Sequence, residues 1–222
     1  MRKIIFACVS ILSIGFLNAQ SFDKGNRNFD INLGFGIYNT SIKENSTTLN
    51  PNPADTTVTG KTACTILAPA MEWGVGKRIS IGTSLVYSHY LTSTDSVTGK
   101  KPKASGLDGN FLFNFHFVKS KKADLFCGLK LGIAGFRLNP QDGGIYGSMG
   151  SAFDLHFGGR FYVSERIGII ANLSFPSYTF RKFGDSLDYT YTLKFRGFSI
   201  GTGVAIKLKG KVEQASNTSG GK

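Results

Sequence analysis

Apolar and polar residues alternate with a period of two from Phe29 onwards, and clusters of Gly, Asn, Asp, Pro and Lys interrupt this alternation. A period of two is typical of a β-strand whose two faces meet different environments. In the first segment Phe29 and Ile31 fall on one face, while Asp30 and Asn32 fall on the other. We therefore expect eight strands, at residues 29–38, 63–75, 79–91, 105–118, 124–138, 148–163, 167–178 and 193–208.

The eighth segment departs from strict alternation near Gly197. Phe195 and Phe198 are three residues apart, so they cannot both lie on the apolar face of a regular strand. A β-bulge at Gly197 would absorb this shift, since glycine inside a strand often marks a bulge.

The segments that connect the expected strands alternate between long and short. The long connections are residues 39–62, 92–104, 139–147 and 179–192, and the short ones are 76–78, 119–123 and 164–166. Membrane barrels have this organisation, with tight turns on the periplasmic side and longer loops outside. We therefore predict an all-β fold: a closed antiparallel transmembrane β-barrel of about eight strands, an up-and-down meander over residues 20–208, with both termini in the periplasm.

A soluble barrel is the main alternative, because a secreted lipocalin-like protein also consists of about eight alternating strands. A soluble barrel would turn its apolar face inward and expose the other face to water. Here that other face is dominated by Gly, Ser, Ala and Asn. Such small residues are poor strand formers on an open surface but suit the narrow interior of an eight-stranded barrel, which favours the membrane barrel.

Charged residues are sparse on the small-residue face, and their signs are mixed. If this face lines the lumen, they can form a structural polar network across it. The expected network consists of Glu72, Asp108, Lys130, Asp154, His156, Arg160 and Arg196. Asp154 and His156 are two residues apart, so they share a face and could be joined by a hydrogen bond.

Aromatic residues gather towards both ends of the expected strands. Such rings would form belts at the two interfaces of a bilayer. Those at the short-turn ends are Trp73, Phe117, Phe126, Phe161 and Tyr162, and those at the long-loop ends are Tyr38, Tyr87, Tyr90, Tyr178, Tyr191 and Phe195.

The first 19 residues have the form of a secretory signal peptide. Arg2 and Lys3 precede an apolar run that extends to Leu17, and a cleavage site is expected between Ala19 and Gln20. The run is short for a helix that spans a bilayer, which needs about 20 apolar residues. At the other end, residues 209–222 are rich in Gly, Ser and Lys and predict a polar, disordered tail.

The chain is basic, with a formal net charge of +12. Removal of two basic residues with the signal leaves 24 − 14 = +10. The export signal argues against a nucleic-acid partner, so we expect the counter-charge to come from phosphate-rich outer-membrane lipid and lipopolysaccharide. Cys64 and Cys127 fall on non-neighbouring strands and opposite faces, which predicts two free thiols. The widely scattered histidines lack metal-ligand spacing, so no metal or cofactor is expected.

Several short motifs resemble the porin-like outer-membrane β-barrel domain family, of the small eight-stranded kind found in Bacteroidetes-type Gram-negative bacteria. They are the signal end Asn18-Ala19-Gln20, Gly34-Phe35-Gly36 in the first strand, the hairpin at residues 73–82, and Ser164-Glu165-Arg166-Ile167-Gly168. The resemblance covers residues 20–208. It implies an outer-membrane location and contact with the barrel-insertion machinery; the chain departs from the family in continuing past its last strand as a polar tail.

The sequence predicts a structural or surface-interaction role rather than catalysis. No nucleophile is placed to complete a site with His156 and Asp154, so we expect no enzyme. Eight strands leave a lumen mostly filled by side chains, which argues against a general diffusion pore. A narrow conduit for one small or apolar ligand and a secreted ligand-binding barrel are the alternatives, and the sequence does not name an extracellular partner.

Overall fold

The computed structural model describes residues 24–46, 51–52, 57–94, 99, 101–120, 122–139, 146–183 and 190–208, except for the side chains of residues 182 and 183. The expected signal peptide with its cleavage site at Ala19 and Gln20, and the expected tail at 209–222, lie outside this part of the chain. Within the described part, no helix has the length and apolar character needed to cross a membrane.

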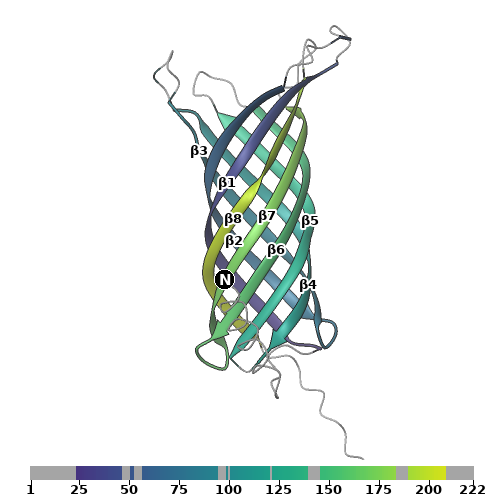
Figure 1. Ribbon diagram of the computed structural model, residues 1–222, viewed down its shortest axis with the longest axis vertical. Helices are drawn as coiled ribbons and strands as arrows, with labels where there is room; N and C mark the ends of the chain where they lie inside the picture. The colour runs from purple at the N-terminus through teal and green to yellow at the C-terminus, as the bar shows by residue number, and fades with distance from the viewer. Residues whose placement is uncertain are drawn as a thin grey trace, which may run out of the picture.

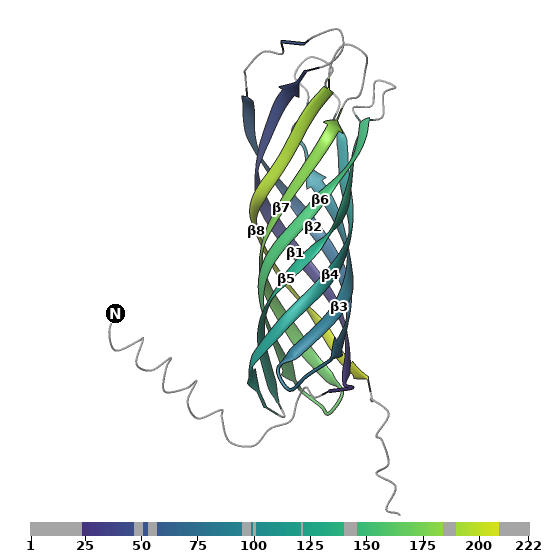
Figure 2. The ribbon, with the colours of Figure 1, turned by 90° about the vertical axis from the view of Figure 1, so that its right-hand side faces the viewer.

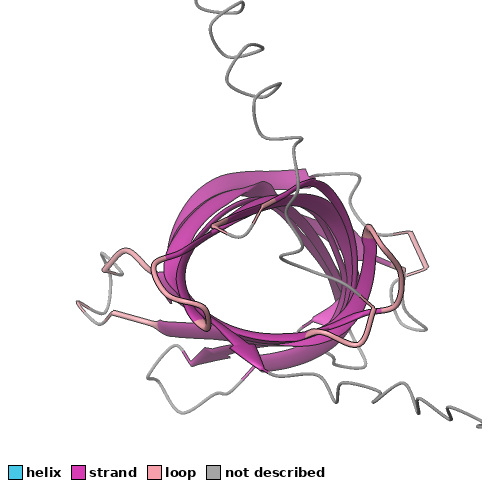
Figure 3. Ribbon diagram, turned by 90° about the horizontal axis from the view of Figure 1, so that it is seen from below, coloured by secondary structure: helices cyan, strands magenta, loops and turns pink. Residues whose placement is uncertain are grey.

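Eight antiparallel strands form a closed barrel in which each strand pairs with the next one in sequence. Figures 1 and 2 show the barrel from two sides, and Figure 3 shows the closed ring of strands from one end. The strands are β1 (Arg27–Asn45), β2 (Thr57–Gly74), β3 (Ile79–Leu91), β4 (Lys103–Lys119), β5 (Ala123–Asn139), β6 (Tyr146–Tyr162), β7 (Ile167–Phe183) and β8 (Thr190–Leu208).

The pairing of β1 with β8 closes the ring. Its register runs without interruption from Arg27 opposite Leu208 to Asn45 opposite Thr190. Both ends of the barrel chain therefore lie at the short-turn end, at the bottom of Figure 1. The predicted fold, a closed eight-stranded antiparallel meander, is confirmed.

The apolar face of every strand points outward. Leu33, Phe111 and Ile133 are all more than 60% exposed, whereas the alternate positions are buried in the lumen. Soluble monomers rarely expose apolar surface on every strand in this way. The soluble alternative required the apolar face to be inside, so the structure argues directly against a lipocalin-like barrel.

Short and long connections alternate as expected, but the long ones are shorter than the sequence indicated. β1 continues to Asn45 and β2 begins at Thr57, so the first long connection is 46–56 rather than 39–62. β7 likewise continues to Phe183, and β8 begins at Thr190. The first five residues of β2 are exposed on both faces. Apolar alternation is lost where both faces are exposed, so the sequence pattern placed the start of β2 too late.

The expected bulge at Gly197 was wrong. Gly197 pairs with Tyr38 in the uninterrupted β1–β8 register, and a Cβ at this position would overlap the Ile37 carbonyl oxygen. Glycine is needed there for close approach of the strands rather than for a bulge. Register shifts occur instead between His116 and Val118, and between Phe180 and Phe183.

Without a bulge, Arg196 lies on the outer surface and is exposed. The prediction that Arg196 belongs to the lumen network was therefore wrong. The regular alternation instead places Phe195 inside, where it is 4% exposed, and Phe198 outside, where it is 45% exposed.

The expected aromatic belts were also wrong in part. Six of the rings assigned to them are buried inside the barrel: Tyr38, Tyr90, Phe126, Tyr162, Tyr178 and Phe195. Tyr87, Phe117 and Phe161 do face outward. The belts were predicted from the position of each ring along its strand. Successive residues of a strand point to opposite faces, so half of these positions face the lumen instead of the membrane.

Candidate functional site

The lumen contains three layers of side chains, and the layer near the short turns is charged. Its centre is Arg160 of β6, which is 1% exposed. The Arg160 guanidinium donates hydrogen bonds to Asp30, at 2.6 Å from Nη2 to Oδ2, and to Asp124, at 3.0 Å from Nη1 to Oδ2. It also contacts the Glu72 carboxylate. One planar cation thus connects acids on three other strands, which is the geometry that suits arginine.

His116 of β4 extends this charged layer. Its Nδ1 lies 2.6 Å from Asp124 Oδ1, and its Nε2 lies 2.9 Å from Glu72 Oε1. Ionised carboxylates only accept hydrogen bonds, so an imidazolium with two N–H groups satisfies both contacts. Ser80 of β3 donates to Glu72 and lies 2.9 Å from His116 Nε2. The charged cluster, defined as Asp30, Glu72, Ser80, His116, Asp124 and Arg160, therefore joins six consecutive strands.

An aromatic ring covers the charged cluster towards the middle of the lumen. The Arg160 Cζ atom lies 4.5 Å from the centroid of the Phe126 ring, a cation–π contact. Phe126 has room because Gly158, on the neighbouring strand, has no side chain: a Cβ there would overlap the ring. The small residues of the lumen face thus accommodate a few large side chains.

The middle layer contains the pair formed by Lys130 and Asp154. They lie opposite each other on β5 and β6, with 2.9 Å between Nζ and Oδ2. The second oxygen of Asp154 accepts the backbone N–H of Phe175 at 3.0 Å. This contact occurs where the β7–β8 pairing omits Phe175 and Pro176. The Asp154 carboxylate thus supplies an acceptor that the neighbouring strand does not.

The expected hydrogen bond between Asp154 and His156 is not formed. His156 Nε2 instead lies 2.8 Å from Asn114 Oδ1 on β4, while Asp154 is engaged with Lys130 and Phe175. Two residues of one strand that share a face point in parallel directions: Asp154 finds its partners on the adjacent strands β5 and β7, whereas His156 reaches past β5 to Asn114. Asp108 is a further buried acid of this layer, and the Tyr178 side chain is its hydrogen-bond partner.

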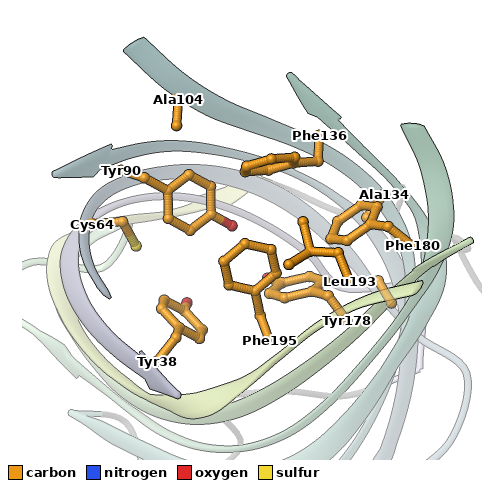
Figure 4. Packing of buried hydrophobic residues seen from close by; sticks show 11 residues of the cluster. Tyr38, Cys64, Tyr90, Ala104, Ala134, Phe136, Tyr178, Phe180, Leu193 and Phe195 are labelled. Carbon is orange, nitrogen blue, oxygen red and sulfur yellow. The ribbon is translucent and has the colours of Figure 1, made fainter. Parts of the chain in front are cut away.

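The layer nearest the long loops is an aromatic cluster, shown in Figure 4. Phe195 lies at its centre, with its ring centroid 5.2 Å from that of Tyr90 and 5.3 Å from that of Phe136. Tyr38 and Phe180 surround it at 6.4 and 5.9 Å. The rings come from five strands and fill the cross-section above the polar residues.

Two small cavities lie between these layers, lined by residues that the structure describes. One, beside Lys130 and Asp154, offers about 60 Å³ to water-sized molecules, and one beside Arg160 and His156 offers about 40 Å³. A single water needs about 10–15 Å³ on this measure. Each of these two cavities has room for a few water molecules and is far too small for a nutrient molecule.

Ser80, His116 and Asp124 are connected in the order of a serine-hydrolase triad. The surroundings oppose catalysis. The Ser80 hydroxyl also donates to Glu72, Asp124 also pairs with Arg160, and Ser80 is completely buried and lines neither cavity. A substrate carbonyl could reach Oγ only if the charged cluster came apart.

Among the residues that the structure describes, no group of three or more His, Cys, Asp or Glu side chains is arranged to hold a metal ion. The three carboxylates of the charged cluster surround a guanidinium instead. Cys64 and Cys127 are free thiols, on β2 and β5. Cys64 points into the lumen, and Cys127 lies on the opposite face.

Of the residues expected in the lumen network, Glu72 and Arg160 meet in the charged cluster, and Lys130 pairs with Asp154. Asp108 and His156 face inward but have other partners, and Arg196 lies outside. Sequence analysis missed Asp30, Asp124 and His116 as members of the cluster. The sequence pattern did place Asp30 and His116 on the polar face of their strands. It did not show which residues of other strands they would contact.

No model of a known protein family matches this sequence, and no curated protein matches it either. Among solved structures, the chain is similar to the outer membrane protein OprG from Pseudomonas aeruginosa, at 11% identity and a TM-score of 0.51. That match covers 86% of this chain and 99% of OprG. The outer membrane protein AlkL, solved in lipid bilayers, matches at 10% identity and a TM-score of 0.51, over 88% of this chain and 95% of AlkL. Identities this low establish a shared fold, the small closed barrel of these outer-membrane proteins.

Proposed function

We propose that this protein is an integral outer-membrane barrel with a structural or surface-interaction role, and that it is neither an enzyme nor a diffusion pore. One observation carries the proposal: the wall is apolar outside, while the lumen is closed by the charged cluster at one level and by the aromatic cluster at another. The apolar wall suits hydrocarbon. The closed lumen supports a role for the loops and the outer rim rather than passage of solutes.

The same proposal gives the chain an orientation. The short turns and both ends of the barrel chain face the periplasm, and the long connections face the outside, as in other membrane barrels. An N-terminal signal peptide would direct export, the barrel-insertion machinery would assemble the wall, and outer-membrane lipid and lipopolysaccharide would surround it. Nucleic acid has no place among these partners.

The membrane placement is tested by gel mobility of the outer-membrane fraction, with unheated and boiled samples compared in detergent. A closed barrel resists detergent until it is heated, so the unheated band should migrate differently in this fraction. A protein found in the soluble fraction, with one mobility before and after boiling, would contradict the proposal.

The closed lumen is tested separately by planar-bilayer recordings of pure refolded protein. We expect no conductance steps, because the charged and aromatic layers cross the lumen and the two cavities found between the described side chains are water-sized. Reproducible unitary steps would favour the alternative, a narrow conduit for one small ligand. Deletion of residues 46–56 tests the loop role in the same preparation: loss of surface binding with an intact barrel would support it.

A further inference from the structure

A basic groove lies on the outer surface of the barrel near the long loops. It spans β8, β1 and β2 and has a volume of about 690 Å³, within the range of small-molecule sites. Its outward-facing side chains are Asn39, Ser41, Thr59, Lys61, Lys194 and Arg196. None of the residues that line it is acidic.

Strand register explains the shape of the groove. Asn39 of β1 is opposite Lys61 on one side and Arg196 on the other. In the next row Ser41 is opposite Thr59 and Lys194. Short side chains on the central strand therefore lie between long basic side chains on its two neighbours, which produces a floor with cationic walls.

The three cations have no partner within the described part of the chain. Lys61, Lys194 and Arg196 are exposed, and neither an ion pair nor a side-chain hydrogen bond engages them there. Three positive charges thus converge on one open space with several hydroxyl and amide groups. Lysine and arginine placed in this way bind phosphate through charge-assisted hydrogen bonds.

The groove also lies at the boundary of the apolar wall. One row nearer the middle of the barrel, Ile37 is flanked by Ala63 and Phe198. Ile37 and Phe198 are each more than 40% exposed on the outer surface. A molecule with a phosphorylated headgroup in the groove would therefore place its acyl chains directly on apolar side chains.

We propose that this groove binds the phosphate groups of a glycolipid headgroup in the outer leaflet. The inference rests on the proposed outer-membrane placement, and it adds a defined ligand class and site. The occupant is a lipid rather than free phosphate, because the cationic walls continue without interruption into the apolar surface.

The test uses full-length mature protein in uncharged detergent micelles, with binding followed by native mass spectrometry. The probes are lipid A carrying two phosphates, the same lipid A with both phosphates removed, and inorganic phosphate. The wild type should retain diphosphorylated lipid A and bind the dephosphorylated form much more weakly. Equal binding of the two lipids would overturn the proposal, and so would efficient competition by inorganic phosphate at concentrations similar to the lipid.

The groove variant combines Lys61→Ala, Lys194→Ala and Arg196→Ala. Each basic residue near an anionic lipid surface contributes about a factor of five, so the three together should lower affinity roughly 100-fold. The matched control combines Lys103→Ala, Arg137→Ala and Arg181→Ala, three exposed basic residues of the same end that do not line the groove. This control removes the same charge, and its affinity for the lipid should stay within about threefold of wild type. Equal losses of affinity in the two variants would show that net charge alone determines binding and would reject the site.

The fold and the placement are monitored independently. Both variants should keep the heat-dependent gel shift, since all six replaced side chains are exposed. If the wild-type protein were absent from the outer membrane, the proposed function would fail whatever the lipid affinity. If the wild type were in the outer membrane but did not discriminate between the two lipids, only the groove proposal would fail.

Discussion

Arg160 and Asp30 are separated by 130 residues in the chain, and their side chains meet inside the barrel with both carboxylate oxygens of Asp30 facing the guanidinium. They lie on β6 and β1, which are not neighbouring strands. This contact therefore spans the lumen rather than following the wall. The barrel is held across its width as well as around its circumference.

Arg160→Ala should strongly destabilise the barrel. The substitution leaves Asp30, Glu72 and Asp124 buried without their shared cation, and loss of one partner from a buried ionic group costs about 3–5 kcal/mol. Urea unfolding in lipid vesicles measures the effect. Arg137→Ala, at an exposed outward position, is the control and should change stability by less than about 0.5 kcal/mol. Similar curves for both variants would mean that the cluster contributes little.

Asp154→Ala should cost more than Lys130→Ala. Both variants break one ion pair, but only Asp154→Ala also removes the acceptor of the Phe175 N–H. Phe175 lies on the outer wall, and a backbone donor that faces hydrocarbon without an acceptor costs at least about 1–3 kcal/mol. A partly exposed ion pair contributes about 1 kcal/mol or less. Unfolding midpoints of the two variants provide the comparison. A reversed order would show that the backbone contact is replaced by water without cost.

Gly158→Ala should destabilise the barrel because the new Cβ overlaps the Phe126 ring. Forcing a methyl group into a packed interior costs about 1–3 kcal/mol. The double variant with Phe126→Leu should recover part of the loss, so a double-mutant cycle over the two positions should give a non-zero coupling energy. Strict additivity would place the strain elsewhere, for example against Asn172, whose side chain is also close.

The faces assigned to β8 are testable by cysteine labelling. In a background with Cys64→Ala and Cys127→Ala, Arg196→Cys should react with a maleimide in intact proteoliposomes, because this position is exposed on the outer surface. Phe195→Cys should not react, since Phe195 is 4% exposed and packed among aromatic rings. After denaturation both thiols should be labelled equally. Labelling of Phe195→Cys but not of Arg196→Cys would indicate that β8 has a bulge at Gly197 after all.

Ser80 should not react with a fluorophosphonate, a probe that labels active serine nucleophiles. The hydroxyl is buried, and it donates a hydrogen bond to Glu72 instead of facing an open site. Mass spectrometry of the folded protein after treatment gives the result, with a known serine hydrolase as the positive control. If the wild type were labelled and Ser80→Ala were not, the charged cluster would have to open to the probe. Ser80, His116 and Asp124 could then act as a catalytic triad.

The strand count, the strand order and the inward or outward orientation of most residues were predictable from sequence, because each depends on local alternation. β3 has the predicted bounds, since its alternation is regular from Ile79 to Leu91. Where both faces are polar, as at the start of β2, alternation carries no information and the boundary was missed. One misplaced bulge reversed the orientation of Arg196, because a shift of one residue moves a side chain to the opposite face.

The partners within the lumen were much less predictable. Mixed charges on one face indicated pairing in general, but His156 bonds to Asn114 rather than to Asp154, and Arg160 reaches Asp30 across the barrel. Such contacts depend on the register of several strands together. The aromatic cluster was missed for a related reason, since a ring such as Tyr38 near a strand end suits either an interface or a closed lumen.

The seam between β1 and β8 joins the first and the last strand of the barrel, so the wall cannot be completed before Leu208 has been made. Until then the sheet has two open edges, and open edges of an apolar sheet recruit other chains. Closure of the ring therefore depends on both ends of the barrel chain at once. A chain that stops before Thr190 lacks the strand that closes the ring, and quality control that recognises the final strand would thereby verify the entire molecule.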